Sequence, residues 1–187
     1  SLLNSFPEHA PPYLEMAFVD GMTVDEWLDN ERRPVEARLQ VFRELLLAVR
    51  AVHRAGFAHR DLSLTNILVA NEDGAPRVTL VDFGLAHPLD DRECDGRRQG
   101  TPQYCAPEQR DYGTSTARGD IYQLGVILFR LMTEEFPITH ATNLALAHRY
   151  HKPKRLAAPL LGAKRGQQLD AIVQRCLEKD PADRFEG

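Results

Sequence analysis

The chain has 187 residues, of which 43% are hydrophobic and 27% are charged, a composition typical of a folded domain and unlike that of a disordered chain. Its formal net charge is −4 and its basic residues are scattered among acids, so no nucleic-acid partner is expected. No apolar run approaches the roughly 18 residues of a membrane span, and the start lacks the basic segment of a signal peptide. We therefore expect no membrane contact from this segment.

The three cysteines, Cys94, Cys105 and Cys176, are odd in number and far apart, without ligand spacing to histidine. Neither a disulfide framework nor a zinc site is predicted, and a reducing, cytoplasmic location fits best. The chain does not begin with methionine, which suggests a piece of a longer protein.

The N-terminal part predicts a strand followed by a short helix. Residues 13–19 form an apolar run broken once by a glutamate, which indicates a strand that ends in a turn at residues 20–21. Thr23 and Glu26 have the spacing of a capping box, so a short helix carrying Trp27 should begin there.

A long helix is predicted between Pro34 and Gly56, because proline suits a first helical turn and glycine a helix end. We expect one of its faces to lie in the core, namely the face with Leu39, Phe42, Leu46, Val49 and Val52. Two short β-type runs, 67–69 and 78–81, flank a turn-rich segment and predict a hairpin.

Two further helices are expected in the second half of the chain. Residues 120–132 read as an apolar, deeply buried helix with Ile121, Leu124, Leu128 and Leu131 at helical spacing. A later amphipathic helix carries Leu169, Ile172, Val173, Cys176 and Leu177.

Three motifs occur in order between these elements: His-Arg-Asp-Leu-Ser-Leu-Thr-Asn at 59–66, Asp-Phe-Gly at 82–84 and Ala-Pro-Glu at 106–108. Each motif alone has an ordinary structural explanation, such as a surface turn or a way of leaving a strand. Their order is not expected by chance, nor is the spacing of Asn66 five positions after Asp61.

These motifs resemble those of the C-terminal lobe of a Hanks-type protein kinase. Residues 100–109, Gly-Thr-Pro-Gln-Tyr-Cys-Ala-Pro-Glu-Gln, are similar to the bacterial serine/threonine branch, and 120–125 and 180–185 resemble the start of its central helix and its closing motif. The resemblance implies an α+β, protein-kinase-like fold with a mainly α-helical C-lobe and a short β-hairpin at the catalytic cleft. Residues 1–20 would be a remnant of a largely missing N-lobe, and 21–187 a C-lobe truncated before its last helix.

The resemblance also implies a protein serine/threonine kinase that uses ATP and Mg²⁺ to phosphorylate a protein substrate. Asp61 would orient and deprotonate the attacking hydroxyl, while Asn66 and Asp82 would coordinate Mg²⁺. Arg60 normally meets a phosphate on the activation loop, and Thr101 would belong to the substrate platform and contact Asp61.

Other positions carry over as binding or structural residues. Adenine would meet the gatekeeper Met16, the hinge Ala17, Phe18 and Val19, and the pocket floor Leu68. For Met16 and Leu68, plain core packing is an equally good explanation. Structural roles are implied for three pairs: Glu108 with Arg184, Asp120 with the catalytic-loop backbone, and His59 beneath Phe83. The remaining histidines are interpreted as surface or helix positions without metal spacing.

Three departures from the family pattern matter. Ser63 stands where serine/threonine kinases usually carry a lysine that touches the transferring phosphoryl group, so we expect weaker but not absent catalysis. The glycine-rich loop, strand lysine and helix glutamate of the family are not found. Residues 85–99, at the place of the activation loop, contain no serine, threonine or tyrosine that could be phosphorylated. The negative charge that Arg60 would otherwise meet on a phosphate could come from acidic side chains, or these side chains could simply form a solvated loop. They are Asp90, Asp91, Glu93 and Asp95.

Two alternatives stay open. A pseudokinase or scaffold would bind partners through the helical lobe without catalysis, which the intact Asp61, Asn66 and Asp82 argue against. A small-molecule phosphotransferase of related fold would share the catalytic loop but not the segments that build a protein-substrate platform.

Overall fold

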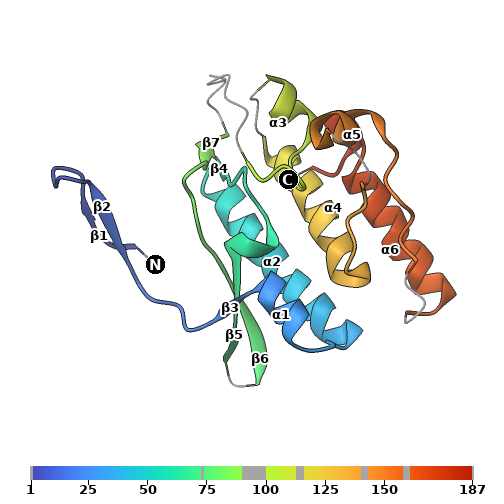
Figure 1. The fold of residues 1–187 in the computed structure, drawn as a ribbon, viewed down its shortest axis with the longest axis horizontal. Coiled ribbons are helices and arrows are strands. Elements are labelled where there is room, and N and C mark those ends of the chain that lie inside the picture. Colours follow the sequence, from blue (N-terminus) through green and yellow to red (C-terminus); the bar gives the residue numbers. More distant parts are fainter. Residues whose placement is uncertain are drawn as a thin grey trace.

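The computed structural model describes residues 2–72, 74–89, 100–112, 116–139, 143–157 and 161–186. Helices form its body, with three of the longest, α2, α4 and α6, lying side by side and α4 in the middle (Figure 1). The helices are α1 (Val24–Asn30), α2 (Val35–Arg54), α3 (Pro107–Tyr112), α4 (Ala117–Thr133), α5 (Leu144–Tyr150) and α6 (Ala163–Cys176), with single 3₁₀ turns at Leu64–Asn66 and Pro181–Asp183. Within the described residues, no helix is both long and apolar enough to cross a membrane.

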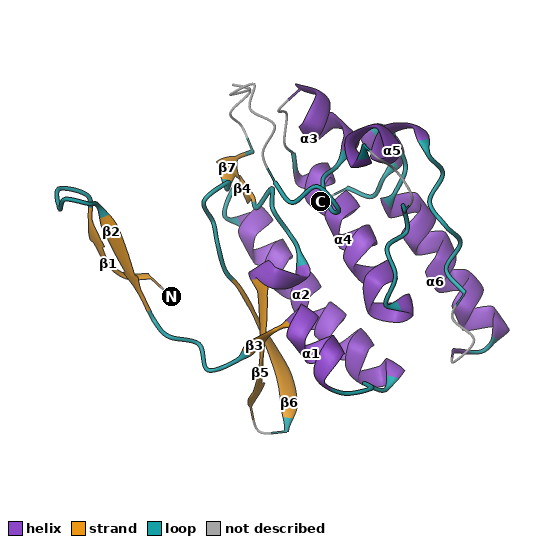
Figure 2. Ribbon diagram, in the orientation of Figure 1, coloured by secondary structure: helices purple, strands orange, loops and turns teal. Residues whose placement is uncertain are grey.

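The strands form three small antiparallel groups (Figure 2). The hairpin β1–β2 lies apart from the helices, the sheet β3–β5–β6 packs beside α2, and β4 pairs with β7. Their bounds are β1 (Leu2–Phe6), β2 (Tyr13–Met16), β3 (Met22–Thr23), β4 (Phe57–Ala58), β5 (Ile67–Glu72), β6 (Ala75–Leu80) and β7 (His87–Pro88).

Most predicted elements are present with small changes of length. The capping box is complete, since the Glu26 amide donates to the Thr23 hydroxyl and the Thr23 amide to the Glu26 carboxylate. Gly56 follows α2 with a φ of 84°, which glycine adopts without steric cost. The predicted hairpin is β5–β6, in which Ile67 is paired with Leu80.

The predicted strand over 13–19 is wrong for its last three residues. β2 ends at Met16, which is paired with Leu2 of β1. Residues 17–20 therefore have no neighbouring strand in the described part of the chain, and a strand without a ladder leaves its backbone groups unpaired. The second hairpin strand likewise ends at Leu80 rather than at residue 81.

The predicted buried face of α2 is only partly correct. Val49 is buried, but Leu46 is 43% exposed, and the buried line is instead formed by Arg38, Val41, Leu45 and Val49. Apolar residues occupy two adjacent stripes of this helix, so periodicity alone did not distinguish them. Arg38 belongs to the buried stripe because its guanidinium donates to the Leu131 carbonyl of α4 at 2.8 Å.

The core lies around α4. Leu124, Leu128 and Leu131 are at most 3% exposed, as predicted for a deeply buried helix. On α6, Val173 and Cys176 are buried as the predicted amphipathic helix requires, but Ile172, which was predicted on the same apolar side, is 43% exposed. Burial raises the pKa of the Cys176 thiol to about 11, so this cysteine stays protonated.

Candidate active site

The expected catalytic loop, residues 59–66, connects β4 to β5. A buried carboxylate on α4 anchors this loop. Asp120 is fully buried, and its two oxygens accept hydrogen bonds from the His59 and Arg60 amides at 2.8 and 2.9 Å. The imidazole of His53 on α2 lies 2.8 Å from the same carboxylate. The expected role of Asp120 is confirmed, and every donor in this group has an acceptor, which an uncharged side chain at 120 would not provide.

The sequence did not predict that His53 and His148 would be buried. They lie on helices, as interpreted, but neither is at the surface: the His53 side chain is 8% exposed and His148 is 1% exposed. The His148 ring lies 2.7 Å from the buried Tyr122 hydroxyl. Histidines that hold other polar groups inside a core carry no sequence spacing that reveals them.

The Asp61 carboxylate is held by residues on both sides of the loop. The amide and hydroxyl of Thr101 donate to Asp61 Oδ1 at 2.8 and 2.9 Å, which agrees with the expected contact. The Asn66 side-chain amide donates to the Asp61 carbonyl at 2.9 Å and to Oδ2 at 3.2 Å. The carboxylate orientation is therefore fixed, while Asp61 itself stays half-buried and reachable.

Asn66 and Asp82 are brought to the same end of the β5–β6 hairpin. Asn66 directly precedes β5, Asp82 follows β6 by two residues, and the Val81 amide donates to the Asn66 carbonyl at 3.0 Å. The NH₂ group of Asn66 donates to Asp61, so the amide oxygen of Asn66 is left to bind a cation. The exposed carboxylate of Asp82 offers a second oxygen ligand at this end of the hairpin. This donor set consists of hard oxygens, as Mg²⁺ prefers.

The described residues contain no group of three or more His, Cys, Asp or Glu side chains placed to hold a metal. A cation at Asn66 and Asp82 would therefore complete its shell with water and with oxygens of a bound phosphate, which is how Mg²⁺ is commonly held. The two residues fit Mg²⁺ in this shared role.

His59 lies beneath the Asp-Phe-Gly segment. Its ring centroid is 4.8 Å from that of Phe83, as expected, and its Nε2 lies 3.2 Å from the Val81 carbonyl. A carbonyl only accepts, so Nε2 carries the proton. Burial lowers the pKa of His59, while the carboxylates of Asp120, Asp61 and Asp82 partly oppose this effect. The imidazole of His59, with its proton on Nε2, thus connects the catalytic loop to Val81, just after the end of β6.

Ser63 and Arg60 are both buried beside Asp61, at 1% and 5% exposure. The Ser63 hydroxyl is 2.9 Å from that of Thr65, so it is already engaged within the loop. Arg60 has a φ of 72°, a conformation that residues with a side chain seldom adopt. The acidic residues expected to face it, Asp90, Asp91, Glu93 and Asp95, lie outside the described residues.

The residues expected around adenine are not gathered into a pocket. Met16 and Phe18 are 62% and 90% exposed, Ala17 and Val19 are half-buried, and Leu68 lies on the sheet β3–β5–β6. Figure 1 shows the β1–β2 hairpin standing away from that sheet, joined to it by the segment after Met16. The hinge and the floor of the expected site are thus separate, in contrast to the closely connected Asp61, Asn66 and Thr101.

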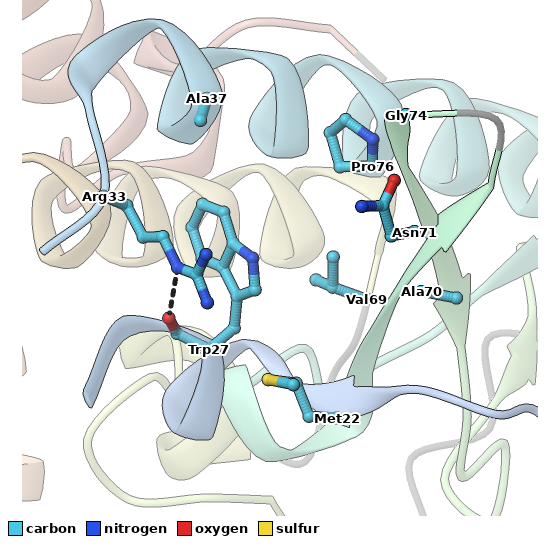
Figure 3. Close-up of a pocket in the computed structure, with 9 residues that line it drawn as sticks. All are labelled: Met22, Trp27, Arg33, Ala37, Val69, Ala70, Asn71, Gly74 and Pro76. Carbon is cyan, nitrogen blue, oxygen red and sulfur yellow. Dashed lines mark hydrogen bonds between the residues drawn. The ribbon is translucent and has the colours of Figure 1, made fainter. Parts of the chain in front are cut away.

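A pocket of about 310 Å³ lies on the other face of β5 (Figure 3). Val69 lines it, whereas Leu68, the residue before it in the strand, points to the opposite face. Trp27 forms one wall, and the Arg33 guanidinium lies 4.8 Å from its ring centroid and donates to its carbonyl at 3.0 Å. This pocket belongs to the junction of α1, α2 and the hairpin, not to the Asp61 site.

The platform that follows Thr101 is fixed by a buried ion pair. Two nitrogens of Arg184 donate to the two carboxylate oxygens of Glu108 on α3 at 2.7 and 2.8 Å, and the Arg184 side chain is fully buried. The expected pair is confirmed. Its bidentate geometry fixes the start of α3 relative to the segment around Arg184. The Ala-Pro-Glu segment at the start of α3 is held in place with it.

Comparison with known proteins agrees with this geometry. The family model described as protein kinase domain matches residues 1–186. The chain belongs to the protein kinase family. Among curated relatives of this kinase domain, a probable serine/threonine-protein kinase of Streptomyces coelicolor is 31% identical over 181 residues, which cover 94% of the chain and 26% of that protein. Serine/threonine-protein kinase PknB of Mycolicibacterium smegmatis is 29% identical, with 96% and 29% covered.

The kinase domain is also 31% identical to a probable serine/threonine-protein kinase PknB of Lactococcus lactis, over 92% of the chain and 28% of the relative. The chain therefore spans less than a third of the length of the relatives it matches. These relatives place it in the bacterial serine/threonine branch of the Hanks-type kinases, as the motifs indicated.

Proposed function

We propose that this chain supplies the catalytic base, the Mg²⁺ ligands and the substrate platform of a protein serine/threonine kinase. The observation that carries the proposal is the set of hydrogen bonds on Asp61, which joins the catalytic loop, the metal-site asparagine and the platform at one carboxylate. Phosphoryl transfer relies mainly on positioning and electrostatic stabilisation, and a carboxylate held from several sides meets the first requirement.

In the proposed reaction, a substrate serine or threonine hydroxyl approaches Asp61, which orients it and accepts its proton. Asn66 and Asp82 hold Mg²⁺, which when bound supplies positive charge to the phosphate oxygens of ATP. Thr101 keeps the carboxylate turned toward the platform, where a protein segment would lie. Ser63 provides no charge at this point, so we expect slower transfer than with a lysine there.

The adenine site and the division of the chain are part of the same proposal. We assign residues 1–20 to an N-lobe hairpin and hinge, and residues 21–187 to the C-lobe. ATP would bring Met16, Ala17, Phe18, Val19 and Leu68 around adenine, which requires the hairpin to come closer to the β5–β6 sheet. We also propose that the kinase acts on a protein substrate in the reducing cytoplasm, which suits its buried cysteines Cys105 and Cys176.

Two observations favour a second candidate, a lobe that binds partners without catalysis. The hinge residues Met16 and Phe18 are largely exposed, and Ser63 replaces a cation at the site of transfer. In such a protein the Asp61 hydrogen bonds would serve only to stabilise the loop.

The test is phosphoryl transfer from γ-labelled ATP to casein or to itself by the full-length protein that carries this chain. Asp61→Asn should lower kcat by a factor of roughly 10²–10⁴, because general base catalysis contributes about that much. Its melting temperature should stay close to that of the wild type, since asparagine keeps the side-chain shape. Transfer that is absent from the wild type, or equal in the Asp61→Asn variant, would favour the scaffold instead.

A further inference from the structure

Two buried amide side chains hold the backbone on either side of Asp61. Gln123 of α4 accepts from the Leu62 amide at 2.9 Å through Oε1 and donates to the Arg60 carbonyl at 2.8 Å through Nε2. Gln109 of α3 donates to the same Arg60 carbonyl at 2.7 Å. The two residues are 0% and 2% exposed, so water does not compete for these bonds.

These contacts have a specific geometric consequence. The Arg60 carbonyl and the Leu62 amide belong to the two peptide groups that flank the Asp61 Cα. When both peptide planes are fixed, the direction of the Cα–Cβ bond of Asp61 is fixed as well. The orientation of the Gln123 amide follows from its partners, because the Leu62 N–H only donates and the Arg60 carbonyl only accepts.

The loop needs this support because its backbone is strained there. Arg60 has a φ of 72°, and such a conformation persists only where the surroundings enforce it. The Asp120 carboxylate holds the Arg60 amide, and the two glutamines hold its carbonyl. The residue before Asp61 is thus fixed at both of its backbone polar groups.

The amide pair also contacts the segment that leads into the platform. Gln123 Nε2 lies 3.2 Å from Gln109 Oε1, so the two side chains form one unit. At Gly100, where φ is 104°, a Cβ atom would lie 3.1 Å from Gln109 Nε2 and 3.5 Å from the Arg60 carbonyl. The next residue, Thr101, bonds to Asp61. A side chain at position 100 would crowd Gln109 and would strain the backbone, so glycine favours this close approach of the platform to the glutamines.

We propose that Gln109 and Gln123 are positioning residues for Asp61, and that they couple the place of the substrate platform to the direction of this side chain. They touch neither substrate nor nucleotide and act only through the loop backbone. The inference rests on the proposed function, in which Asp61 is the base.

The test uses Gln123→Met in the full-length protein, because methionine has a similar length and no hydrogen-bonding amide. We expect kcat to fall at least 10-fold while the KM for ATP changes less than 2-fold, and hydrogen exchange at the Leu62 amide to accelerate. Gln109→Met removes one of two donors to Arg60 and should lower kcat by a smaller factor. The matched control is Leu128→Val, on another face of α4, which should lower the melting temperature and leave kcat unchanged.

Two results would overturn the proposal: a kcat for Gln123→Met equal to that of Leu128→Val, or unchanged exchange at Leu62. The assay also separates this inference from the function on which it rests. If the wild type transfers no phosphoryl group, the kinase proposal fails. The positioning of the loop by Gln123 is then decided by the Leu62 exchange alone, where acceleration supports it and no change refutes it.

Discussion

The catalytic loop and the hinge differ sharply in how they are held. Around Asp61, backbone groups of His59, Arg60 and Leu62 are bonded to buried side chains of α3 and α4. Residues 17–20 have no strand partner in the described chain, and Phe18 is 90% exposed. The part that would perform proton transfer is therefore held by side chains of the helical core, whereas the part that would hold adenine is not.

This difference predicts where substitutions destabilise the protein. The largest effect is expected for Asp120→Ala, which leaves the His59 and Arg60 amides and the His53 ring without their acceptor. At about 1–3 kcal/mol for each of the three unsatisfied groups, the free energy of unfolding should fall by at least about 3 kcal/mol, measured by urea unfolding. The exposed Asp29→Ala on α1 is the control and should change it by less than about 0.5 kcal/mol. Equal effects of the two variants would contradict the anchoring role.

A somewhat smaller effect is expected at the platform. Glu108→Gln removes the charge opposite the fully buried Arg184, and breaking such a pair typically costs about 3–5 kcal/mol, at the lower end here because glutamine still accepts one hydrogen bond. The pair of the exposed Arg155 with Asp170 offers a comparison, since Arg155→Met removes a charge that water already solvates and should cost at most about 1 kcal/mol. Thermal unfolding of both variants measures the contrast, and a Glu108→Gln variant as stable as Arg155→Met would show that the platform is not fixed by this pair.

The pH dependence should report the burial of His59. Burial lowers its folded pKa below the ordinary value of 6.5, so between the two values the unfolded state binds more protons than the folded state. The free energy of unfolding should therefore fall as pH drops below about 6.5, by at most about 1.4 kcal/mol per pH unit for one proton.

His59→Phe keeps a ring beneath Phe83 but cannot titrate. Urea unfolding between pH 7.5 and 5.5 should give a shallower pH slope for this variant than for the wild type. Identical slopes would mean that His59 is protonated in the folded protein or does not titrate differently on unfolding.

The smallest effect is expected at the hinge. Phe18→Ser should alter the free energy of unfolding by less than about 0.5 kcal/mol, as is usual for exposed positions. Calorimetry without nucleotide measures this directly. A loss above about 1 kcal/mol would show that the hinge packs against the rest of the protein and would remove the contrast between the two regions.

The sequence predicted the catalytic loop better than its supports, for physical reasons. Asp61, Asn66, Asp82 and Thr101 lie in segments that resemble kinase motifs, so the resemblance alone was enough to propose them as site residues. The roles of Glu108 with Arg184 and of Asp120 also followed from resemblance to the family. Gln109, Gln123, His53 and His148 act through contacts across up to 67 positions of the chain, and no local pattern marks them.

The errors in secondary structure have a similar origin. The strand predicted to reach residue 19 ends at Met16, and the extent of a strand depends on its pairing and not on composition alone. On α2, Leu46 and Leu45 are equally apolar, and the packing of the helix against α4 and β6 determines that Leu45 is the buried one. Tertiary contacts decide where a strand ends and which of two neighbouring apolar residues is buried, and the local sequence does not contain this information.

Hydrogen exchange of individual backbone amides in the protein without nucleotide tests the contrast between the two regions most directly. The amides of His59, Arg60, Leu62 and Thr101, each bonded to a side chain, should exchange slowly, whereas those of Ala17, Phe18, Val19 and Asp20 should exchange nearly as fast as an unfolded peptide. Fast exchange throughout the catalytic loop, at rates like those of the hinge, would contradict a loop organised by the helical core.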